Sequence, residues 1–382
     1  MKEPARAIRE MPRSGIREIF DRANQISGAI HLEMGEPDFS TPIHIRDAAV
    51  AALEAGFTKY TPNAGLMTLR EAAAAKVARV NGINVDASQV VVTSGGIAGL
   101  YASMLALCDP GDELLLIGPA WPNYRMIAQL LGVSVRQVPL SGTAEGHPTI
   151  EDLERHRSKQ TKVVLLNSPS NPTGMVFDEP ETLAIVEWAE RHGLWILSDE
   201  VYDQITFDRP AVSPYRLSTA GNVISVFSFS KTYSMTGWRL GYTVAPPEMI
   251  GLIQKTFEPI FACTSGSIQM AGVAALEGPQ DCIETMRSAY QVRRDLAAAM
   301  LTDARIPFAL PAGAFYLWID ISASGQTSTK FASDLLESQH VAVTPGIAFG
   351  PFCDSFIRVS LASHEDVIRA GVTGIVAALK NA

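Results

Sequence analysis

Short apolar runs alternate with longer amphipathic segments through the middle of the chain. The apolar runs predict strands at residues 112–117, 133–140, 162–167, 194–198, 223–229 and 240–245. Between several of these runs, apolar positions at helical spacing predict helices over 94–108, 121–131 and 181–191. Because strands that alternate with helices build parallel sheets covered by helices, the pattern predicts an α/β fold with a mostly parallel sheet.

The C-terminal part of the chain has a different pattern. A long amphipathic helix is predicted over residues 279–304. It is followed by predicted strands at 315–320, 341–343 and 356–359 and by predicted helices at 329–339 and 365–380. This arrangement predicts a smaller α+β domain in addition to the large α/β domain.

Polar residues follow three consecutive predicted strands. Asn171 stands after the strand at 162–167, Asp199 and Tyr202 stand after the next one, and Lys231 follows the third. Because the carboxyl ends of neighbouring parallel strands form one ligand crevice, we expect these side chains to meet there.

Lys231 lies near Phe229, Met235 and Trp238, in a segment rich in small and hydroxyl residues. A solvated lysine gains nothing from such neighbours, whereas a partly dry, cationic setting helps a lysine to lose its proton and attack a carbonyl. The pattern therefore indicates a lysine that forms an imine, and pyridoxal phosphate is the expected carbonyl compound. The alternative is an ordinary lysine near a turn, because Ser-x-x-Lys by itself is a weak signal.

Further motifs extend this pattern over nearly the whole chain. They occupy residues 32–39, 60–65, 69–72 and 356–360. In order and spacing they resemble the class I aminotransferases of the fold-type I pyridoxal phosphate enzymes. The resemblance implies a large cofactor-binding domain at 45–287 and a smaller domain formed by 1–44 with 288–382.

The resemblance also implies roles around the cofactor ring. Asp199 matches the anion that faces the protonated ring nitrogen, with capping of a following helix as its alternative. Asn171 and Tyr202 match the residues that hydrogen-bond the ring hydroxyl, although Asn-Pro-Thr-Gly is also a turn signal and Tyr202 also suits a core. Trp121 matches the aromatic residue that covers the ring face, and a core tryptophan is the competing interpretation.

The cofactor phosphate requires backbone amides, hydroxyl groups and a cation. The candidates are Gly95, Gly96 and Ile97 at the start of a predicted helix, Ser228 and Ser230 as hydroxyl donors, and Arg239. A surface ion pair is the alternative for Arg239. Tyr60 matches a residue that reaches the phosphate bound by a neighbouring subunit, which implies a homodimer with shared active sites.

The substrate's α-carboxylate requires a bidentate arginine, and Arg358 matches that residue of the family. The backbone of Gly35 and the side chain of Asn171 are expected to assist it. The implied reaction is a ping-pong transamination between an amino acid and a 2-oxo acid, in which Lys231 also moves the α-proton.

The expected donor follows from the charges near the site. Residues 97–104 carry no basic side chain of the kind that aspartate specialists use for the distal carboxylate, and residues 345–350 are apolar. A neutral or aromatic donor is therefore favoured, with 2-oxoglutarate or pyruvate as acceptor. A dicarboxylate donor stays open as the alternative, because the sequence leaves undecided whether Arg13, Arg17 or Arg125 faces the substrate.

Other functions on the same scaffold stay open. Carbon–sulfur β-lyases and ring-forming synthases share the cofactor contacts. A regulator that uses such a domain as a sensor would need a DNA-binding module, and residues before 32 show no helix-turn-helix pattern. If the protein had only a structural or partner-binding role, its biological activity would not require Lys231.

Composition agrees with a soluble globular enzyme. Of the 382 residues, 47% are hydrophobic and 19% charged, and a net charge of −9 with interspersed signs gives no basic stripe for nucleic acid or membranes. Cys108, Cys263, Cys282 and Cys353 lie far apart, so neither disulfides nor a metal site is predicted. Without an apolar signal peptide or membrane span, cytoplasmic residence is expected.

Overall fold

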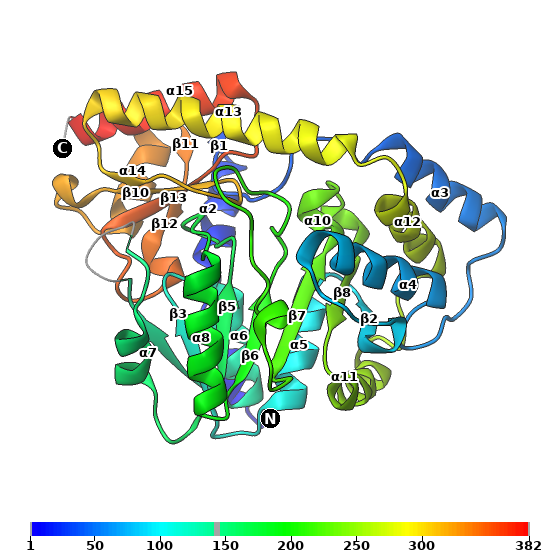
Figure 1. Cartoon of the computed structure of the whole chain (residues 1–382). Helices are drawn as coiled ribbons and strands as arrows, with labels where there is room; N and C mark the ends of the chain where they lie inside the picture. Colours follow the sequence, from blue (N-terminus) through cyan, green and yellow to red (C-terminus); the bar gives the residue numbers. More distant parts are fainter. Residues whose placement is uncertain (1, 141–145, 381–382) are drawn as a thin grey trace.

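A seven-stranded sheet forms the centre of the molecule (Figure 1). In this computed structural model, which describes residues 2–140 and 146–380, the strand order is β2-β8-β7-β6-β5-β3-β4. The strands are β2 (Val90–Thr93), β3 (Glu113–Ile117), β4 (Ser134–Val138), β5 (Thr161–Asn167), β6 (Trp195–Asp199), β7 (Val223–Ser228) and β8 (Gly241–Val244). Strand β8 runs antiparallel to both of its neighbours, and the other neighbouring pairs are parallel. The predicted mostly parallel sheet is confirmed, and β2 is a strand that the sequence pattern missed.

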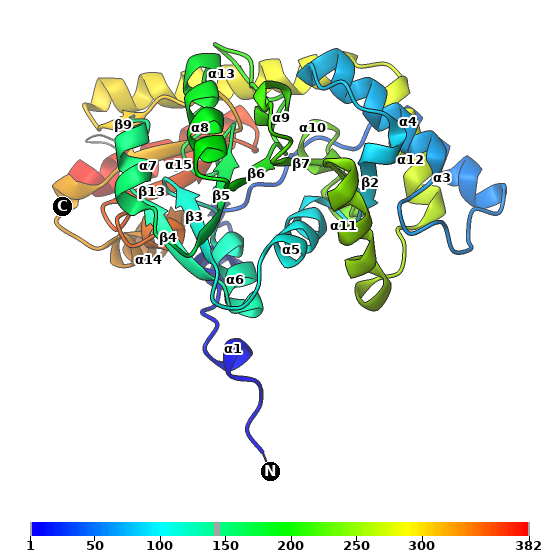
Figure 2. The same ribbon diagram turned by 60° about the horizontal axis from the view of Figure 1, so that its bottom comes forward.

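Helices cover both faces of this sheet, because successive side chains of each central strand point to opposite sides. In β5, Val163 and Leu165 pack in one cluster with α5 (Gly96–Leu107) and α6 (Pro122–Leu131). Val164 and Leu166 pack in another cluster with α8 (Glu179–Arg191). The four central residues of β5 are therefore all apolar and buried, as expected for a sheet covered on both faces (Figure 2).

The remaining helices surround this core. The α-helices are α1 (Arg6–Arg9), α2 (Gly15–Ala23), α3 (Ile43–Glu54), α4 (Met67–Lys76), α7 (Ile150–His156), α9 (Pro214–Leu217), α10 (Phe229–Thr232), α11 (Pro247–Ile260), α12 (Gly266–Glu277), α13 (Asp281–Ala304), α14 (Ser328–Gln339) and α15 (Glu365–Lys380). A π-helical turn covers Val77–Asn81, and 3-10 turns cover Ala87–Gln89, Thr236–Trp238, Ser322–Ser324 and Gly346–Phe349. Predicted helices at 94–108, 121–131, 181–191, 279–304, 329–339 and 365–380 agree with α5, α6, α8, α13, α14 and α15 to within a few residues.

A second group of strands lies beside the large sheet. An antiparallel sheet has the order β12-β13-β10-β9, and a short parallel pair joins β1 to β11. These strands are β1 (Ile30–His31), β9 (Phe308–Ala309), β10 (Tyr316–Asp320), β11 (Val341–Ala342), β12 (Thr344–Pro345) and β13 (Phe356–Ser360). Residues of β1, β9, β10, β11 and β13 share a hydrophobic cluster with α13, α14 and α15. The long helix α13 passes through the expected boundary at residues 287 and 288 and lies along α15 (Figure 1).

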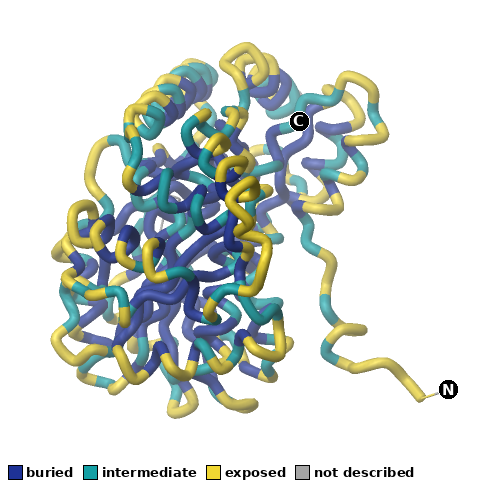
Figure 3. Tube along the Cα trace, turned by 90° about the vertical axis from the view of Figure 1, so that its right-hand side faces the viewer, coloured by how far each residue is buried: buried dark blue, intermediate teal, exposed yellow. Residues whose placement is uncertain are grey.

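The N-terminal segment joins this second group. Ile30 is paired with Val341 and His31 with Ala342, so residues far apart in sequence form one parallel ladder. Residues before α2 form a mostly exposed arm that touches α6, where Nε2 of Gln129 donates to the carbonyl of Ala7 at 2.9 Å, whereas the central strands form a buried interior (Figure 3). Among the described residues, no helix is long and apolar enough to cross a membrane.

Candidate active site

A cavity of about 690 Å³ opens at the carboxyl ends of β5, β6 and β7. Because these strands are neighbours in the sheet, they bring Asn171, Asp199 and Lys231 to one place, as the sequence predicted. Asn167 links two of the strand ends: its Oδ1 accepts from the backbone amide of Asn171 at 2.8 Å, and its Nδ2 donates to the carbonyl of Asp199 at 3.0 Å. The polar residues are therefore held in a fixed arrangement.

Asp199 is a buried carboxylate with two donors. The hydroxyl of Tyr124 on α6 donates to Oδ2 at 2.6 Å, and the amide of Val201 donates to Oδ1 at 3.3 Å. Burial raises the pKa of Asp199 to about 6, and the hydrogen bond from Tyr124 opposes that shift. A protonated ring nitrogen beside this carboxylate would restore the ionised form.

Lys231 lies in the short helix α10, which begins directly after β7. Its Nζ donates to the carbonyl oxygen of Gly35 at 2.5 Å. Burial lowers the pKa of Lys231 to about 8; Glu36 acts against the shift, and the positive charges of Arg358 and Arg239 add to it. A lysine in this environment loses its proton more readily than one in water, so the electrostatics suit a nucleophile.

Several groups that are able to bind an anion meet where α5 lies against the loop after Lys231. As the first residues of α5, Gly96 and Ile97 have backbone amides without acceptors inside the helix. Gly95 caps the helix with φ of +84°, and a Cβ there would lie 2.5 Å from Nη2 of Arg239. The Ser228 hydroxyl lies beside Gly96, so amides, a hydroxyl and a guanidinium meet at this end of the cavity.

Arg358 reaches the cavity from β13 and is almost completely buried. Its Nη1 donates to Oδ1 of Asn171 at 2.9 Å, and its Nη2 donates to the carbonyl of Glu33 and, at 3.2 Å, to the hydroxyl of Thr344. Its Nε has no hydrogen-bond partner in the described part of the chain, and no carboxylate forms an ion pair with it there. An unpaired buried guanidinium nitrogen is costly, and an anionic ligand in the cavity would supply the missing partner.

Two aromatic pairs line the remaining walls. The hydroxyls of Tyr202 and Tyr316 are 2.8 Å apart, and the guanidinium of Arg358 lies 4.4 Å from the centre of the Tyr316 ring. Trp121 meets Tyr124 edge to face, with ring centres 5.6 Å apart. Tyr316 thus connects Arg358 to Tyr202, the tyrosine that follows β6.

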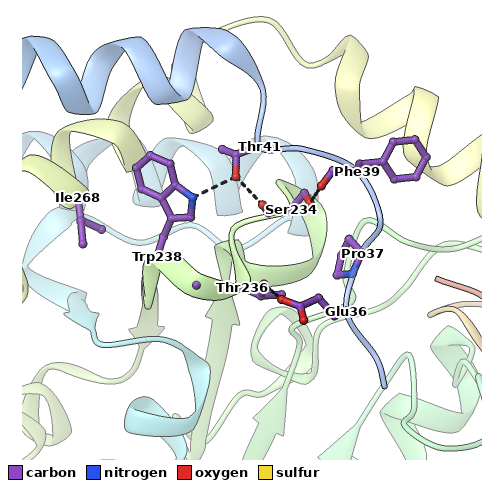
Figure 4. A pocket seen from close by; sticks show the side chains of 9 residues that line it. Glu36, Pro37, Phe39, Thr41, Ser234, Thr236, Trp238 and Ile268 are labelled. Atoms are coloured by element: carbon purple, nitrogen blue, oxygen red, sulfur yellow. Dashed lines mark hydrogen bonds between the residues drawn. The ribbon is translucent and has the colours of Figure 1, made fainter. Parts of the chain in front are cut away.

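A second hollow of about 500 Å³ adjoins the cavity and shares Glu36, Thr236 and Gly237 with it. Figure 4 shows how the N-terminal segment is tied there to the loop after Lys231. The Thr41 hydroxyl donates to the Ser234 carbonyl at 2.6 Å and accepts from Nε1 of Trp238 at 3.0 Å. These bonds hold the segment that supplies Gly35 against the loop that supplies Arg239.

Most residues singled out from the sequence line the cavity. They are Gly35, Gly96, Ile97, Trp121, Asn171, Asp199, Tyr202, Ser228, Ser230, Lys231, Arg239 and Arg358. Gly95 lies just behind Arg239, whereas Tyr60 is 91% exposed and outside the cavity of its own chain. The sequence reasoning missed Tyr124, Asn167 and Tyr316. Of these three residues, only Tyr124 had a local feature in the sequence that pointed to the site: it stands three residues after Trp121 on a predicted helix.

The donors present fit pyridoxal phosphate. The helix terminus, Ser228 and Arg239 suit its phosphate, Asp199 suits the ring nitrogen, and Lys231 suits the aldehyde carbon. Because Oδ1 of Asn171 accepts from Arg358, the Nδ2 of the same amide is free to donate to the ring hydroxyl. Among the described residues, no group of three or more histidine, cysteine or acidic side chains is placed to hold a metal ion.

Comparison with known proteins identifies relatives along almost the whole chain. The family described as aminotransferase class I and II matches residues 27–372. Aspartate aminotransferase of Pyrococcus horikoshii is 35% identical over 96% of this chain and 95% of its own length. Aromatic-amino-acid aminotransferase 2 of Thermococcus litoralis is 33% identical over 96% of both proteins.

Solved structures agree with these sequence matches. The aspartate aminotransferase from Thermus thermophilus with maleate has a TM-score of 0.94 to this chain at 32% identity. The match covers 99% of this chain and 100% of the other, so it includes both the large sheet and the smaller strand group.

Proposed function

Because the chain belongs to the aminotransferase class I and II family and is a pyridoxal phosphate-dependent aminotransferase, we propose which reaction partners it uses. The donor is an L-amino acid with a neutral or aromatic side chain, and the acceptor is a 2-oxo acid such as 2-oxoglutarate or pyruvate. The two half-reactions follow each other in a ping-pong order. One observation supports this proposal above the others. The same cavity contains Lys231, whose pKa is lowered by burial, and the buried Arg358, whose Nε lacks a hydrogen-bond partner among the described residues.

The bound cofactor supplies an electron sink for a carbanion at the substrate's α-carbon. The chain's own groups bind and orient the substrate and move its protons. Arg358 and the Nδ2 of Asn171 are proposed to hold the α-carboxylate, and the amine of Lys231 to remove and return the α-proton. Asp199 keeps a negative charge opposite the ring nitrogen, and Tyr202 donates to the ring hydroxyl.

The side-chain preference rests on the apolar residues of the cavity wall. They are Ile16, Met34, Ile97, Leu100, Trp121 and Met126. An apolar or aromatic donor side chain gains free energy by leaving water against such a surface. The relatives include proteins named for aspartate and for aromatic amino acids, so the wall of this cavity is the more specific guide.

A homodimer with shared sites is part of the proposal. Tyr60 is 91% exposed and lies outside its own cavity, which suits a side chain that completes the partner's phosphate site.

We also propose that the chain is divided into a large domain, residues 45–287, and a smaller one formed by residues 1–44 with 288–382. The four cysteines are free thiols, which suits a reducing cytoplasm.

The test is a half-reaction on enzyme loaded with pyridoxal phosphate, using single L-amino acids without any oxo acid. We expect one equivalent of the matching 2-oxo acid per active site with phenylalanine, methionine or leucine, and less with aspartate. Lys231→Ala should abolish this burst while Arg13→Met, which changes an exposed arginine outside the cavity, should preserve it. Continuous release of pyruvate and ammonia from cystathionine, without the burst, would instead establish a carbon–sulfur lyase.

A further inference from the structure

A buried ion pair joins the end of α4 to the turn that follows β6. The Nζ of Lys76 donates to Oδ2 of Asp203, and the two side chains are only 4% and 5% exposed. Asn81 completes the cluster, because its Oδ1 accepts from Lys76 at 3.0 Å and its Nδ2 donates to Asp203 at 3.1 Å. These three residues do not line the described cavity, and the proposed reaction gives them no role.

The backbone after α4 brings Lys76 and Asn81 together. The π-helical turn Val77–Asn81 begins directly after Lys76, and Gly82 ends it with φ of +68°. Hydrogen bonds in such a turn join residues five apart, which is the separation of Lys76 and Asn81, and turns of this kind are frequent at functional sites. The Nζ of Lys76 also lies 4.7 Å from the centre of the Phe227 ring on β7, so its charge is held against the central sheet.

Asp203 directly follows Tyr202, which lines the cavity. Backbone hydrogen bonds fold this segment into a tight turn: the amide of Asp203 donates to the carbonyl of Glu200 at 3.2 Å, and the amide of Ile205 donates to the carbonyl of Tyr202 at 2.8 Å. The Tyr202 hydroxyl reaches the Tyr316 hydroxyl, whereas the Asp203 carboxylate is bound by the residues at the end of α4. Asp203 therefore anchors the turn that carries Tyr202.

This anchor depends on the charge of Lys76. Within the described part of the chain, Lys76 is the cation that forms an ion pair with Asp203. Removal of one partner of a buried ion pair leaves an uncompensated charge, which is far more costly than the loss of an exposed pair. Without Lys76, the Asp203 carboxylate would turn toward water or bind a proton, and either change would loosen the turn at Tyr202.

We propose that the cluster of Lys76, Asn81 and Asp203 positions Tyr202 against the cofactor ring, so that Lys76 and Asn81 act on the cofactor without touching it. This inference rests on the proposed function, in which Tyr202 donates to the ring hydroxyl. A donor at that oxygen lowers the pH at which the cofactor bound to Lys231 loses its proton. The pH midpoint of the cofactor's absorbance change therefore reports where Tyr202 lies.

Absorbance titrations of the cofactor-loaded enzyme test the assignment. Tyr202→Phe should raise the midpoint by about one to two units, the effect of losing one hydrogen bond to a charged group. Lys76→Met should raise it by about one unit. The double variant Lys76→Met/Asp203→Asn should return close to the unchanged enzyme, because it leaves no buried charge unpaired. Lys162→Met is the matched control, since it removes a partly exposed ion pair with Asp112 outside the cavity wall.

The outcomes separate this inference from the function on which it rests. A shift in Tyr202→Phe without one in Lys76→Met would overturn the inference and keep the role of Tyr202. No shift in Tyr202→Phe would refute the role of Tyr202 and the inference with it. A shift that persists in the double variant would also overturn the inference, because the lost side-chain volume would then be the cause.

A milder variant covers the case in which Lys76→Met does not fold. Asn81→Ala keeps the ion pair and removes two of the bonds that hold it, so it should raise the midpoint by a smaller amount. An unchanged midpoint in Asn81→Ala would then overturn the inference. If the unchanged enzyme transfers no amino group but its midpoint still depends on Lys76 and Tyr202, the proposed reaction is refuted and the positioning of Tyr202 is kept.

Discussion

The Tyr124 hydroxyl donates a 2.6 Å hydrogen bond to Oδ2 of Asp199, and both side chains are buried. Without ligand, burial raises the pKa of Asp199 to about 6, and this bond is the largest effect that opposes the shift. Tyr124 therefore helps to keep negative the carboxylate that we propose opposite the cofactor's ring nitrogen. This pair joins α6 to the end of β6.

Replacement of Tyr124 by phenylalanine should make cofactor binding more sensitive to acid. Loss of the donor raises the pKa of Asp199 further, so its neutral form appears at a higher pH. We expect the affinity of the apoenzyme for pyridoxal phosphate to fall roughly tenfold near pH 6.5, with a smaller loss at pH 8. Fluorescence titrations across this range measure the effect; Tyr215→Phe, which removes a hydroxyl bonded to Gln89, is the matched control. An unchanged pH midpoint would contradict the prediction.

The buried carboxyl group of Glu200 should make the free energy of unfolding depend on pH in a definite direction. Burial raises its pKa from 4.5 to about 7, so the folded apoenzyme holds this proton more tightly than the unfolded chain. The stabilisation is complete below about pH 4.5 and is lost as pH rises through 7. Glu200→Gln should therefore match the unchanged protein at pH 5 and exceed its free energy of unfolding at pH 8.5 by on the order of 2–3 kcal/mol.

Urea unfolding of the apoenzyme at the two pH values measures this difference. Glu187→Gln is the control, because Glu187 is exposed on α8. An equal gain at both pH values would show that the substitution acts by packing and that the proton on Glu200 has no part in it.

Arg358→Lys should separate substrate binding from cofactor binding. Lysine keeps the positive charge but loses the planar fork and its fixed donors to Asn171 and Thr344. We expect kcat/KM for the amino donor to fall by about two orders of magnitude, since each charge-assisted bond contributes roughly 1.5–3 kcal/mol. Absorbance of the bound cofactor should be unchanged. A normal KM for the donor would assign the α-carboxylate to another group.

Mixed dimers test whether Tyr60 serves the neighbouring site. Tyr60→Ala and Lys231→Ala should each reduce activity as homodimers, the first chiefly at limiting pyridoxal phosphate. Subunits exchanged between them should regain activity, because one site of each mixed dimer combines an intact Lys231 with the partner's intact tyrosine. Activity is measured against mixing time, and the two unmixed variants are the controls. Failure to regain activity, with exchange verified by mass, would place Tyr60 outside the shared site.

The local sequence predicted the central sheet well because its strands are apolar on both faces and end in recognisable polar motifs. Asn171, Asp199 and Lys231 follow β5, β6 and β7, and the rule that parallel strands open at their carboxyl ends brings them together. The strand β2 was missed although its residues are Val-Val-Val-Thr. Its pairing with the antiparallel β8 is a long-range contact that no local pattern shows.

The sequence by itself determined the alternating fold, the lysine after β7 and the polar groups at the neighbouring strand ends, because these depend on periodicity and on residue type. The tertiary structure decided which distant groups complete the cavity. Tyr316 and Arg358 come from β10 and β13, and Arg17 comes from α2. Their positions depend on packing between segments far apart in the chain. For the same reason, three arginines equivalent in the sequence differ in the folded protein: Arg13 lies near Asp21, Arg125 is bonded to Gln137, and Arg17 faces the cavity.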